Sequence, residues 1–220
     1  MKIFWFILAC ALFAAAVALH LIACYRRMPK LRRITKPLLM PLLAAMYALI
    51  AQTPHAFVIV ALLCGWLGDV FLLFTKRNIF MLLGMAAFAL GHVFYIGAML
   101  STNPPLHLYV LILLLLAAAW VLFVVKKLLP TAPKSLRIPG LCYAVLLSGT
   151  ALCALYLLFS TQRLCYLVSF VGGLLFMLSD TILTGQKYRK ETRHGNFYVM
   201  LTYILAQMLL VGGFALNGGI

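Results

Sequence analysis

The 220-residue chain contains only three Asp and Glu residues, against 18 Lys and Arg. Charge of either sign is scarce, because charged residues make up 10% of the sequence where a soluble domain has roughly 25%. No polar stretch is long enough to form a soluble domain. With 66% hydrophobic residues and a mean hydropathy of +1.11, the composition excludes a soluble protein and indicates a polytopic integral membrane protein.

Cysteine occurs six times, but never in a C-x-x-C motif or in a Cys/His cluster with metal-ligand spacing. All six cysteines lie in or beside apolar segments, where a small packing side chain is ordinary. Nothing in the sequence therefore indicates a disulfide framework, and we expect neither a metal nor another cofactor.

Apolar segments of about 20 residues, the length that a bilayer requires, make up most of the chain. They lie near residues 3–24, 37–52, 55–75, 79–100, 106–125, 138–160, 164–185 and 196–216. This pattern predicts an all-α transmembrane domain of eight helices over residues 1–220. The second segment is the shortest, and we expect Pro37 in its first turn and either a local kink or a tilted start at Pro41.

The placement of Lys and Arg predicts the orientation. Sixteen of the 18 lie in the first, third, fifth and seventh connections, and the other face holds only Lys2 and Arg163. The positive-inside rule then places these four connections in the cytoplasm and both termini on the opposite side. We expect the basic rim to attract anionic membrane lipids and no nucleic acid, because its charges are spread over four short loops. The short loops favour a bacterial inner membrane over the endoplasmic reticulum.

Two of the three acidic residues, Asp69 and Asp180, lie inside apolar segments. A carboxylate in hydrocarbon costs several kcal/mol unless it is paired, hydrated or protonated, so such residues commonly serve a function. A weak internal duplication relates the two, since a shift of 111 residues lays one upon the other. We therefore predict a parallel repeat with halves 1–103 and 104–220, which would bring both aspartates to one central cavity.

Depth in the bilayer also pairs the two aspartates. Each lies seven residues before a lysine of the basic rim, Lys76 or Lys187, which corresponds to roughly 10 Å along a helix. Tyr203 reaches a comparable depth. Two carboxylates that are close together in a low dielectric tend to share a proton, so one can donate a proton while the other accepts one.

Deeper polar residues complete the predicted pocket, which would open to the cytoplasmic side. His92 lies about 20 Å from that end by the rise of a helix, near the level of Gln207. Each residue also has a plain structural interpretation. An intramembrane Asp or His can simply bond two helices, Tyr95 and Tyr203 can be packing aromatics, and Lys36 can be an anchor that extends to the interface.

These motifs, in their order and spacing, resemble the YhhN-like lysoplasmalogenase family over nearly the whole chain. The residues that carry the resemblance are Lys36-Pro37-Leu38, Leu67-Gly68-Asp69, Gly84 through Phe88 with His92 and Tyr95, Ser179-Asp180, and Thr202-Tyr203 with Gln207. The resemblance implies hydrolysis of the vinyl-ether bond of a lysophospholipid substrate, lysoplasmalogen, to a fatty aldehyde and glycerophosphoethanolamine or glycerophosphocholine.

The implied chemistry fits the residues, because a vinyl ether is cleaved by a proton donor together with a base that activates water. Asp69 and Asp180 are then the expected catalytic pair, with their two roles unassigned. We expect Tyr95 and Tyr203, with His92 and Gln207, to orient water and the glycerol hydroxyl. The remaining candidate, Lys36, is expected to meet the phosphate.

Two other functions fit the same residues. A proton-coupled transporter or lipid flippase also uses intramembrane carboxylates, although both aspartates lie towards one leaflet and not at the midplane. A membrane scaffold could use the aspartates only to hold its helices together.

Overall fold

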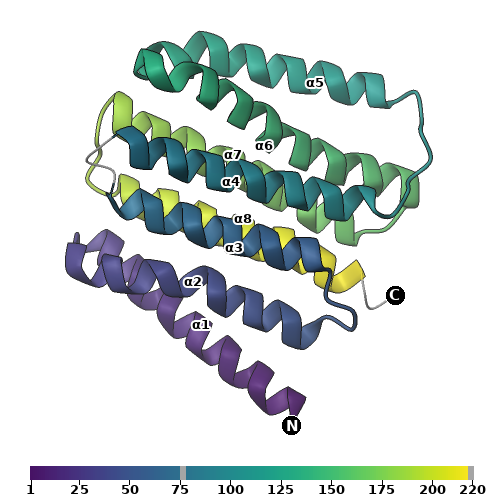
Figure 1. Cartoon of the computed structure of the whole chain (residues 1–220), viewed down its shortest axis with the longest axis horizontal. Helices are drawn as coiled ribbons and strands as arrows, with labels where there is room; N and C mark the ends of the chain where they lie inside the picture. The colour runs from purple at the N-terminus through teal and green to yellow at the C-terminus, as the bar shows by residue number, and fades with distance from the viewer. Residues whose placement is uncertain (75–77, 218–220) are drawn as a thin grey trace.

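The computed structural model of the chain describes residues 1–74 and 78–217. It is all-helical over these residues, and Figure 1 shows the order of the elements. The α-helices are α1 (Lys2–Tyr25), α2 (Pro29–Ile50), α3 (Ala56–Phe71), α4 (Asn78–Leu100), α5 (Val110–Phe123), α6 (Lys134–Thr161), α7 (Cys165–Tyr188) and α8 (Gly195–Asn217). Three short helical turns extend α3 and α5: η1 (Leu72–Phe74), the π-helical η2 (Val124–Leu128) and η3 (Leu129–Thr131).

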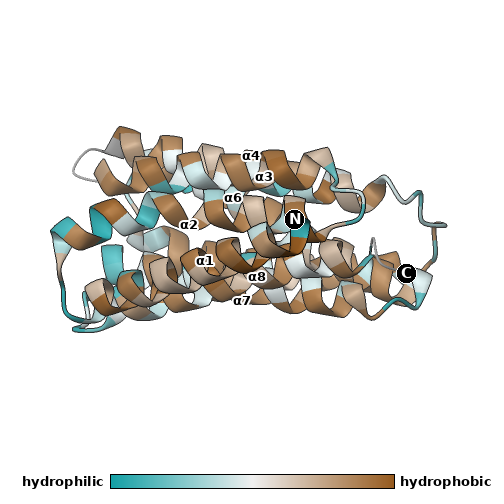
Figure 2. Cartoon of the chain, turned by 90° about the horizontal axis from the view of Figure 1, so that it is seen from below, coloured by the Kyte–Doolittle hydropathy of each residue, from teal (hydrophilic) through white to brown (hydrophobic). Residues whose placement is uncertain are grey.

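Within the described ranges, eight helical segments are long and apolar enough to span a bilayer, which confirms the predicted number. They run alternately up and down, so the two termini lie at the same end of the bundle (Figure 1). Seen from below, α3 and α4 form one side and α7 and α8 the other, with α2 and α6 between them (Figure 2). Helices α1 and α5 lie at the two outer edges (Figure 1).

The second helix differs from its prediction. It begins at Pro29 and not at Pro37, so that Pro37 and Pro41 both lie inside it. Proline is well suited to a first helical turn, and Pro29 supplies that start eight residues earlier. The prediction of Pro37 in the first turn was wrong, because the basic residues after Pro29 were assigned to a loop. They form the first two turns of α2 and carry Arg32 and Lys36 into the end of the bundle.

Close helix packing in the centre depends on glycine. A Cβ atom at Gly68 of α3 would lie 2.7 Å from the Phe88 ring of α4. On the other side, a Cβ at Gly172 of α7 would lie 2.6 Å from the backbone nitrogen of Leu210 in α8. Small residues allow such approaches between membrane helices. These two pairs of helices therefore form the tight walls between which the polar residues lie.

The helices make contacts in a similar order in the two halves of the chain. Helix α2 packs on α3 and α3 on α4, as α6 packs on α7 and α7 on α8. The halves 1–103 and 104–220 and their symmetry nevertheless stay a prediction, as does the side of the membrane on which the termini lie.

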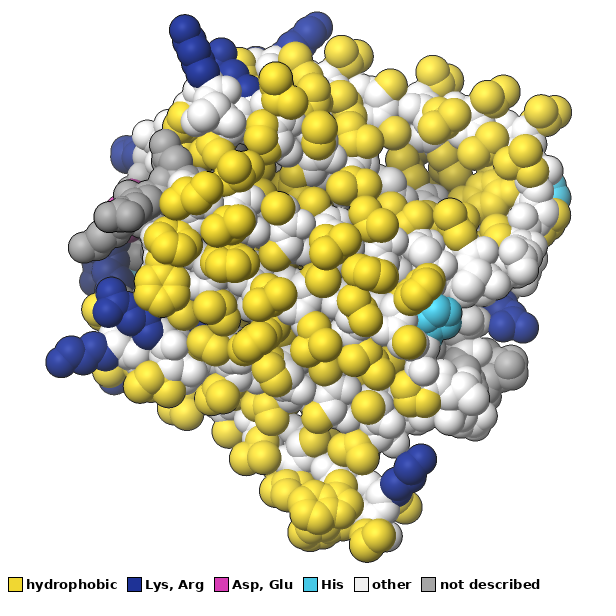
Figure 3. Space-filling model, in the orientation of Figure 1, with side chains coloured by type: hydrophobic (Ala, Val, Ile, Leu, Met, Phe, Trp, Pro, Cys, Tyr) yellow, Lys and Arg dark blue, Asp and Glu magenta, His cyan; other side chains and the backbone are white. Residues whose placement is uncertain are grey.

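Basic side chains gather at one end of the molecule. Most of the dark-blue side chains in Figure 3 lie at the left and upper left, the end that carries the α1–α2, α5–α6 and α7–α8 connections. We call this the basic end. Lys76 and Arg77, which were counted in the predicted third loop, lie outside the described residues.

Candidate functional site

A polar cavity of about 390 Å³ opens at the basic end, between α2, α3, α4, α7 and α8. Helix α3 places Asp69 in its wall and α7 places Asp180 there. Other polar residues of the wall are Arg32, Lys36, Ser179, Gln186, Lys187, Glu191, Asn196 and Tyr203. The two intramembrane aspartates thus share one cavity although 111 residues separate them.

Asp69 is almost fully buried, with 1% of its surface exposed. Each of its carboxylate oxygens has a donor. The Lys36 ammonium of α2 lies 3.1 Å from Oδ1, and the Tyr203 hydroxyl of α8 donates to Oδ2 at 2.8 Å. Three helices therefore fix the orientation of this carboxylate.

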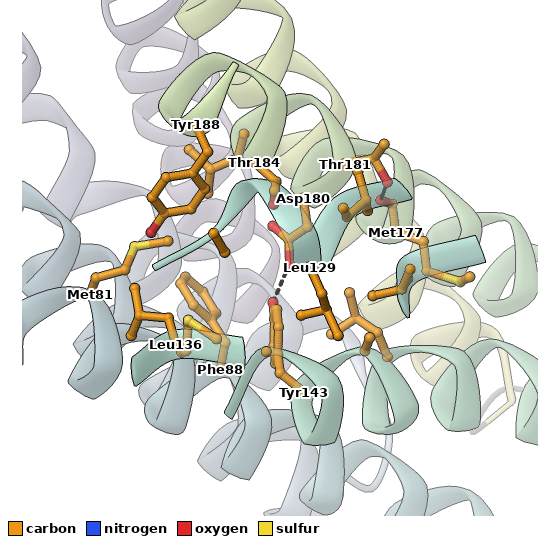
Figure 4. A pocket seen from close by; sticks show the side chains of 18 of the residues that line it. Met81, Phe88, Leu129, Leu136, Tyr143, Met177, Asp180, Thr181, Thr184 and Tyr188 are labelled. Atoms are coloured by element: carbon orange, nitrogen blue, oxygen red, sulfur yellow. Dashed lines mark hydrogen bonds between the residues drawn. The ribbon is translucent and has the colours of Figure 1, made fainter. Parts of the chain in front are cut away.

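Asp180 is only partly buried. Its described hydrogen-bond partner is the Tyr143 hydroxyl of α6, which donates to Oδ2, and Figure 4 shows the two side chains facing each other. Ser179, the preceding residue, donates to the carbonyl of Val199 at 2.9 Å. That bond ties α7 to α8 and sets the rotation of α7 that directs Asp180 inward.

A second, largely apolar cavity of about 100 Å³ adjoins the polar one. Figure 4 shows residues that line it, contributed by α4, η3, α6 and α7. Met81, Phe88, Leu136, Met177 and Tyr188 are among them. Asp180 belongs to the walls of both cavities. Its carboxyl group therefore lies where a polar space meets an apolar one.

His92, Tyr95 and Gln207 lie elsewhere. They lie around a narrow gap in the helix packing and are not part of the lining of either cavity. The Tyr95 hydroxyl donates to Oε1 of Gln207 at 2.8 Å. A Cβ atom built at Gly65 would lie 3.3 Å from Nε2 of Gln207 and 3.7 Å from the Tyr203 hydroxyl. Gln207 and Tyr95 thus form a layer behind Tyr203.

The imidazole of His92 is buried and held by α6. Its Nδ1 lies 3.0 Å from the Thr150 hydroxyl, which itself donates to the carbonyl of Leu146 at 3.1 Å. Because that hydroxyl proton is used, Thr150 accepts from Nδ1–H of His92. The histidine therefore serves as an interhelical contact beneath the cavity, in van der Waals reach of the Phe176 ring, whose centroid is 4.6 Å away.

Each aspartate takes a partner from the preceding helix, but the two partners differ in charge. Lys36 of α2 is a cation beside Asp69, whereas Tyr143 of α6 is a neutral donor beside Asp180. A cation within about 4 Å favours an ionised carboxylate, and a site without one favours the protonated acid. The two carboxyl groups therefore differ in their electrostatic surroundings.

Tyr143 was not among the residues selected from the sequence. It stands in an apolar helix between Cys142 and Ala144, and a tyrosine there is usually a packing residue. The internal duplication could have indicated Tyr143. If Asp69 and Asp180 are equivalent, a polar residue of the sixth segment should face Asp180 as Lys36 faces Asp69.

Comparison with known proteins gives a family model and two curated relatives. The YhhN family model matches residues 31–214. Lysoplasmalogenase TMEM86B of Sus scrofa is 34% identical over 150 residues, which are 68% of this chain and 59% of the relative. Lysoplasmalogenase TMEM86B of Homo sapiens is 28% identical over 156 residues, with the same coverage of 68% and 59%.

The chain thus spans about 59% of the length of each curated relative that it matches. No solved structure matches the chain.

Proposed function

Since this chain belongs to the YhhN family, we propose that it is a membrane lysoplasmalogenase, an enzyme that hydrolyses the vinyl-ether bond of a lysoplasmalogen. The curated relatives carry that name. The reaction consumes one water and gives a fatty aldehyde and a glycerophosphoester.

The position of Asp180 at the junction of the polar and the apolar cavity carries this proposal. A lysoplasmalogen has one apolar chain and one polar headgroup, and its vinyl ether lies close to where the two meet. A lipid with its headgroup in the polar cavity and its chain in the apolar one would bring that bond to Asp180. The small volume of the apolar cavity accommodates only the first part of a long chain. The rest would pass beside α5, the least buried of the eight helices, into the bilayer.

We assign the general acid to Asp180 and the base to Asp69. Lys36, 3.1 Å from Asp69, stabilises an ionised carboxylate there. Asp180 has the neutral donor Tyr143 on Oδ2, which leaves Oδ1 to carry the transferable proton. A protonated acid and an ionised base in one cavity are the pair that this reaction needs.

The first step transfers the Asp180 proton to the β-carbon of the vinyl ether, and the double-bond electrons form the new C–H bond. The oxygen-bound carbon becomes an oxocarbenium ion. The two negative carboxylates then stabilise this cation. Water adds to that carbon and gives its proton to Asp69, which yields a hemiacetal.

The hemiacetal then collapses. Asp180, now ionised, accepts the hemiacetal O–H proton while the C–O bond to glycerol breaks. Asp69 returns its proton to the departing glycerol oxygen. Both aspartates regain their starting states, so the cycle needs no metal and no other cofactor.

Behind the carboxylates, we assign positioning roles to the remaining predicted residues. Tyr203 fixes Oδ2 of Asp69, and Gln207 with Tyr95 supports Tyr203 from behind. His92 holds α4 to α6 through Thr150. We do not assign substrate contacts to His92, Tyr95 or Gln207, because they lie outside both cavities.

The test is aldehyde release from a purified lysoplasmalogen by the protein in detergent. Loss of a positioned acid or base costs about 10²–10⁴-fold in rate, and we expect losses of that size for Asp180→Asn and for Asp69→Asn. The aldehyde must retain every carbon of the alkenyl chain, because the bond that breaks joins the first carbon of that chain to the glycerol oxygen, and no carbon–carbon bond is cleaved.

A lysophospholipid with a saturated ether in place of the vinyl ether is the substrate control, and it should release nothing. Absence of aldehyde from the folded parent protein would refute the hydrolase. A full rate in either Asn variant would refute the paired-carboxylate mechanism.

A further inference from the structure

Two cationic side chains in the wall of the polar cavity each have a nitrogen that lacks a hydrogen-bond acceptor among the described residues, although the Lys187 ammonium also lies 5.8 Å from the centroid of the Tyr188 ring. Nε of Arg32 and Nζ of Lys187 are both buried atoms without a hydrogen-bond acceptor among the described residues. A buried cationic donor that lacks an acceptor is costly. These two residues come from α2 and α7 and line the same cavity, so a ligand anion placed there could satisfy both of them.

The Lys36 ammonium, in contrast, already has a partner. Its ammonium is paired with Asp69, and its side chain is 8% exposed. Among the described residues of the cavity wall, the cationic nitrogens without a hydrogen-bond acceptor therefore belong to Arg32 and Lys187.

A third acidic side chain lies in the same wall, besides Asp69 and Asp180. Glu191, in the α7–α8 connection, is the third acidic residue of the chain and lines the polar cavity. It is exposed to solvent. Within ion-pair distance of its carboxylate there is no described Lys or Arg side chain. Beside it in the wall, Asn196 and Gln186 provide neutral hydrogen-bonding groups.

The connection that carries Glu191 is held in place. The amide of Gln186 donates to the Thr192 hydroxyl at 2.8 Å and accepts from the Thr192 backbone at 2.7 Å. A Cβ atom at Gly195 would lie 1.9 Å from that amide, so only glycine leaves room for it.

Two further contacts tie this connection to the α1–α2 corner. Nε of Arg27 donates to the carbonyl of Arg193 at 3.1 Å. The rings of Tyr25 and His194 stack at 4.4 Å. The two walls of the cavity mouth are thereby fixed relative to each other.

The geometry points to a headgroup site for a zwitterion: Arg32 and Lys187 bind the phosphate of the lipid, and Glu191 binds its terminal ammonium. This inference rests on the proposed function, because it places the lipid with its reacting bond at Asp180. Arg and Lys are the usual partners of a phosphate.

The site also implies a choice between headgroups. A primary ammonium has three N–H donors, which Glu191, Asn196 and Gln186 can accept. A trimethylammonium has none and is recognised by a cage of aromatic rings. The aromatic residues of this cavity, Phe88, Phe176 and Tyr203, pack around one another deep in the bundle beside Asp69 and not beside Glu191. The site therefore favours ethanolamine over choline.

Direct binding tests the site without turnover. The probe is a 1-O-alkyl glycerophosphoethanolamine with a short saturated chain, which has no vinyl ether to cleave, titrated calorimetrically into the purified protein in detergent. The choline analogue and the 1-O-alkyl glycerol phosphate, which has no amine, are titrated in parallel. We expect the ethanolamine lipid to bind more tightly than the choline lipid.

The variants separate the two charges of the headgroup. Arg32→Gln and Lys187→Gln should weaken all three lipids about tenfold to hundredfold, as expected for loss of a hydrogen bond to a charged group. Glu191→Gln should weaken the ethanolamine lipid about tenfold and leave the amine-free phosphate unchanged. Arg33→Gln and Lys190→Gln, exposed neighbours of equal charge, should bind all three as the parent does.

Failure of this site can be told from failure of the hydrolase. If the parent and variants show this binding pattern but no aldehyde is released from lysoplasmalogen, the headgroup site stands and the hydrolase is wrong. If aldehyde is released while folded Arg32, Lys187 and Glu191 variants bind as the parent does, the headgroup site is wrong. Equal weakening by Arg33→Gln would also overturn it, because the effect would then be general charge attraction.

Discussion

At the residue scale, we expect the Lys36–Asp69 ion pair to support stability as well as the proposed chemistry. Both side chains are less than one-tenth exposed. Removal of one member of a buried pair leaves an uncompensated charge and typically costs 3–5 kcal/mol. We expect Lys36→Met to lower the free energy of unfolding by about that amount. The addition of Asp69→Asn should restore most of the stability and none of the aldehyde release.

Unfolding of the purified protein in mixed detergent and SDS measures this effect. Lys30→Met, an exposed lysine of the same helix, is the matched control and should change stability little. Equal stability of Lys36→Met and Lys30→Met would show that the pair contributes nothing.

Tyr143 gives a second prediction at this scale. Its hydroxyl is the described donor to Asp180. Its removal in Tyr143→Phe should slow aldehyde release about tenfold to hundredfold, as expected for loss of one hydrogen bond to an acidic group. Tyr109→Phe, whose hydroxyl bonds a backbone carbonyl at the opposite end of the bundle, is the control and should keep the parent rate. A Tyr143→Phe rate equal to that of Tyr109→Phe would remove Tyr143 from the site.

Some of these residues could be recognised in the sequence because charge is scarce in its apolar segments. Others could not, because they have common structural uses. Asp69 and Asp180 stand out because an acid in an apolar segment is expensive. Tyr143 does not, because a tyrosine in such a segment has a low cost and many structural uses. Arg32 and Lys187 looked like ordinary rim charges, and only the folded chain places their nitrogens in one cavity.

At the scale of elements, the contact between α7 and α8 forms one wall of the site and is set by Gly172. Ala at this position would place its Cβ 2.6 Å from the Leu210 nitrogen and 2.9 Å from the Ala206 oxygen. These are backbone atoms, which cannot move away by a change of side-chain rotamer. We expect Gly172→Ala to destabilise the protein by about 1–3 kcal/mol, the usual cost of overpacking, in thermal unfolding in detergent.

Gly185→Ala on the same helix is the control. A Cβ there would meet no atom within 4 Å, so this variant should gain up to about 1 kcal/mol of helix propensity. A Gly172→Ala variant as stable as Gly185→Ala would mean that α7 and α8 are not closely packed.

The elements themselves were largely predictable, because 20-residue apolar segments have few alternatives to a helix in a bilayer. Their number is confirmed. The start of α2 was not predicted, since Pro29 and Pro37 are both acceptable in a first turn and hydropathy favours the later one. That error concealed Arg32, because the turns that were missed carry it into the bundle on the same helix as Lys36, which had been selected as a candidate.

At the scale of the whole molecule, an even number of spanning helices places both termini on one side, and the basic end on the other. The positive-inside rule predicts that the termini face away from the cytoplasm. In a bacterial host, alkaline phosphatase fused after Asn217 should be active, because it needs an oxidising compartment for its disulfides. The same enzyme fused within the α7–α8 connection, after Lys190, should be inactive. The opposite activities of the two fusions would show that the orientation is the reverse of the predicted one.

The two adjoining cavities have a consequence for what happens after the bond breaks. On the proposed reaction one molecule enters and two leave, each suited to a different phase. The aldehyde has the apolar cavity and the hydrocarbon beyond α5 as its exit, while the glycerophosphoester has the wet mouth at the basic end. On this proposal the products would separate into lipid and water, which would lower the concentration of both at the site and slow the re-formation of the hemiacetal. A reactive aldehyde is also delivered to the membrane without passing the amines dissolved in the aqueous phase.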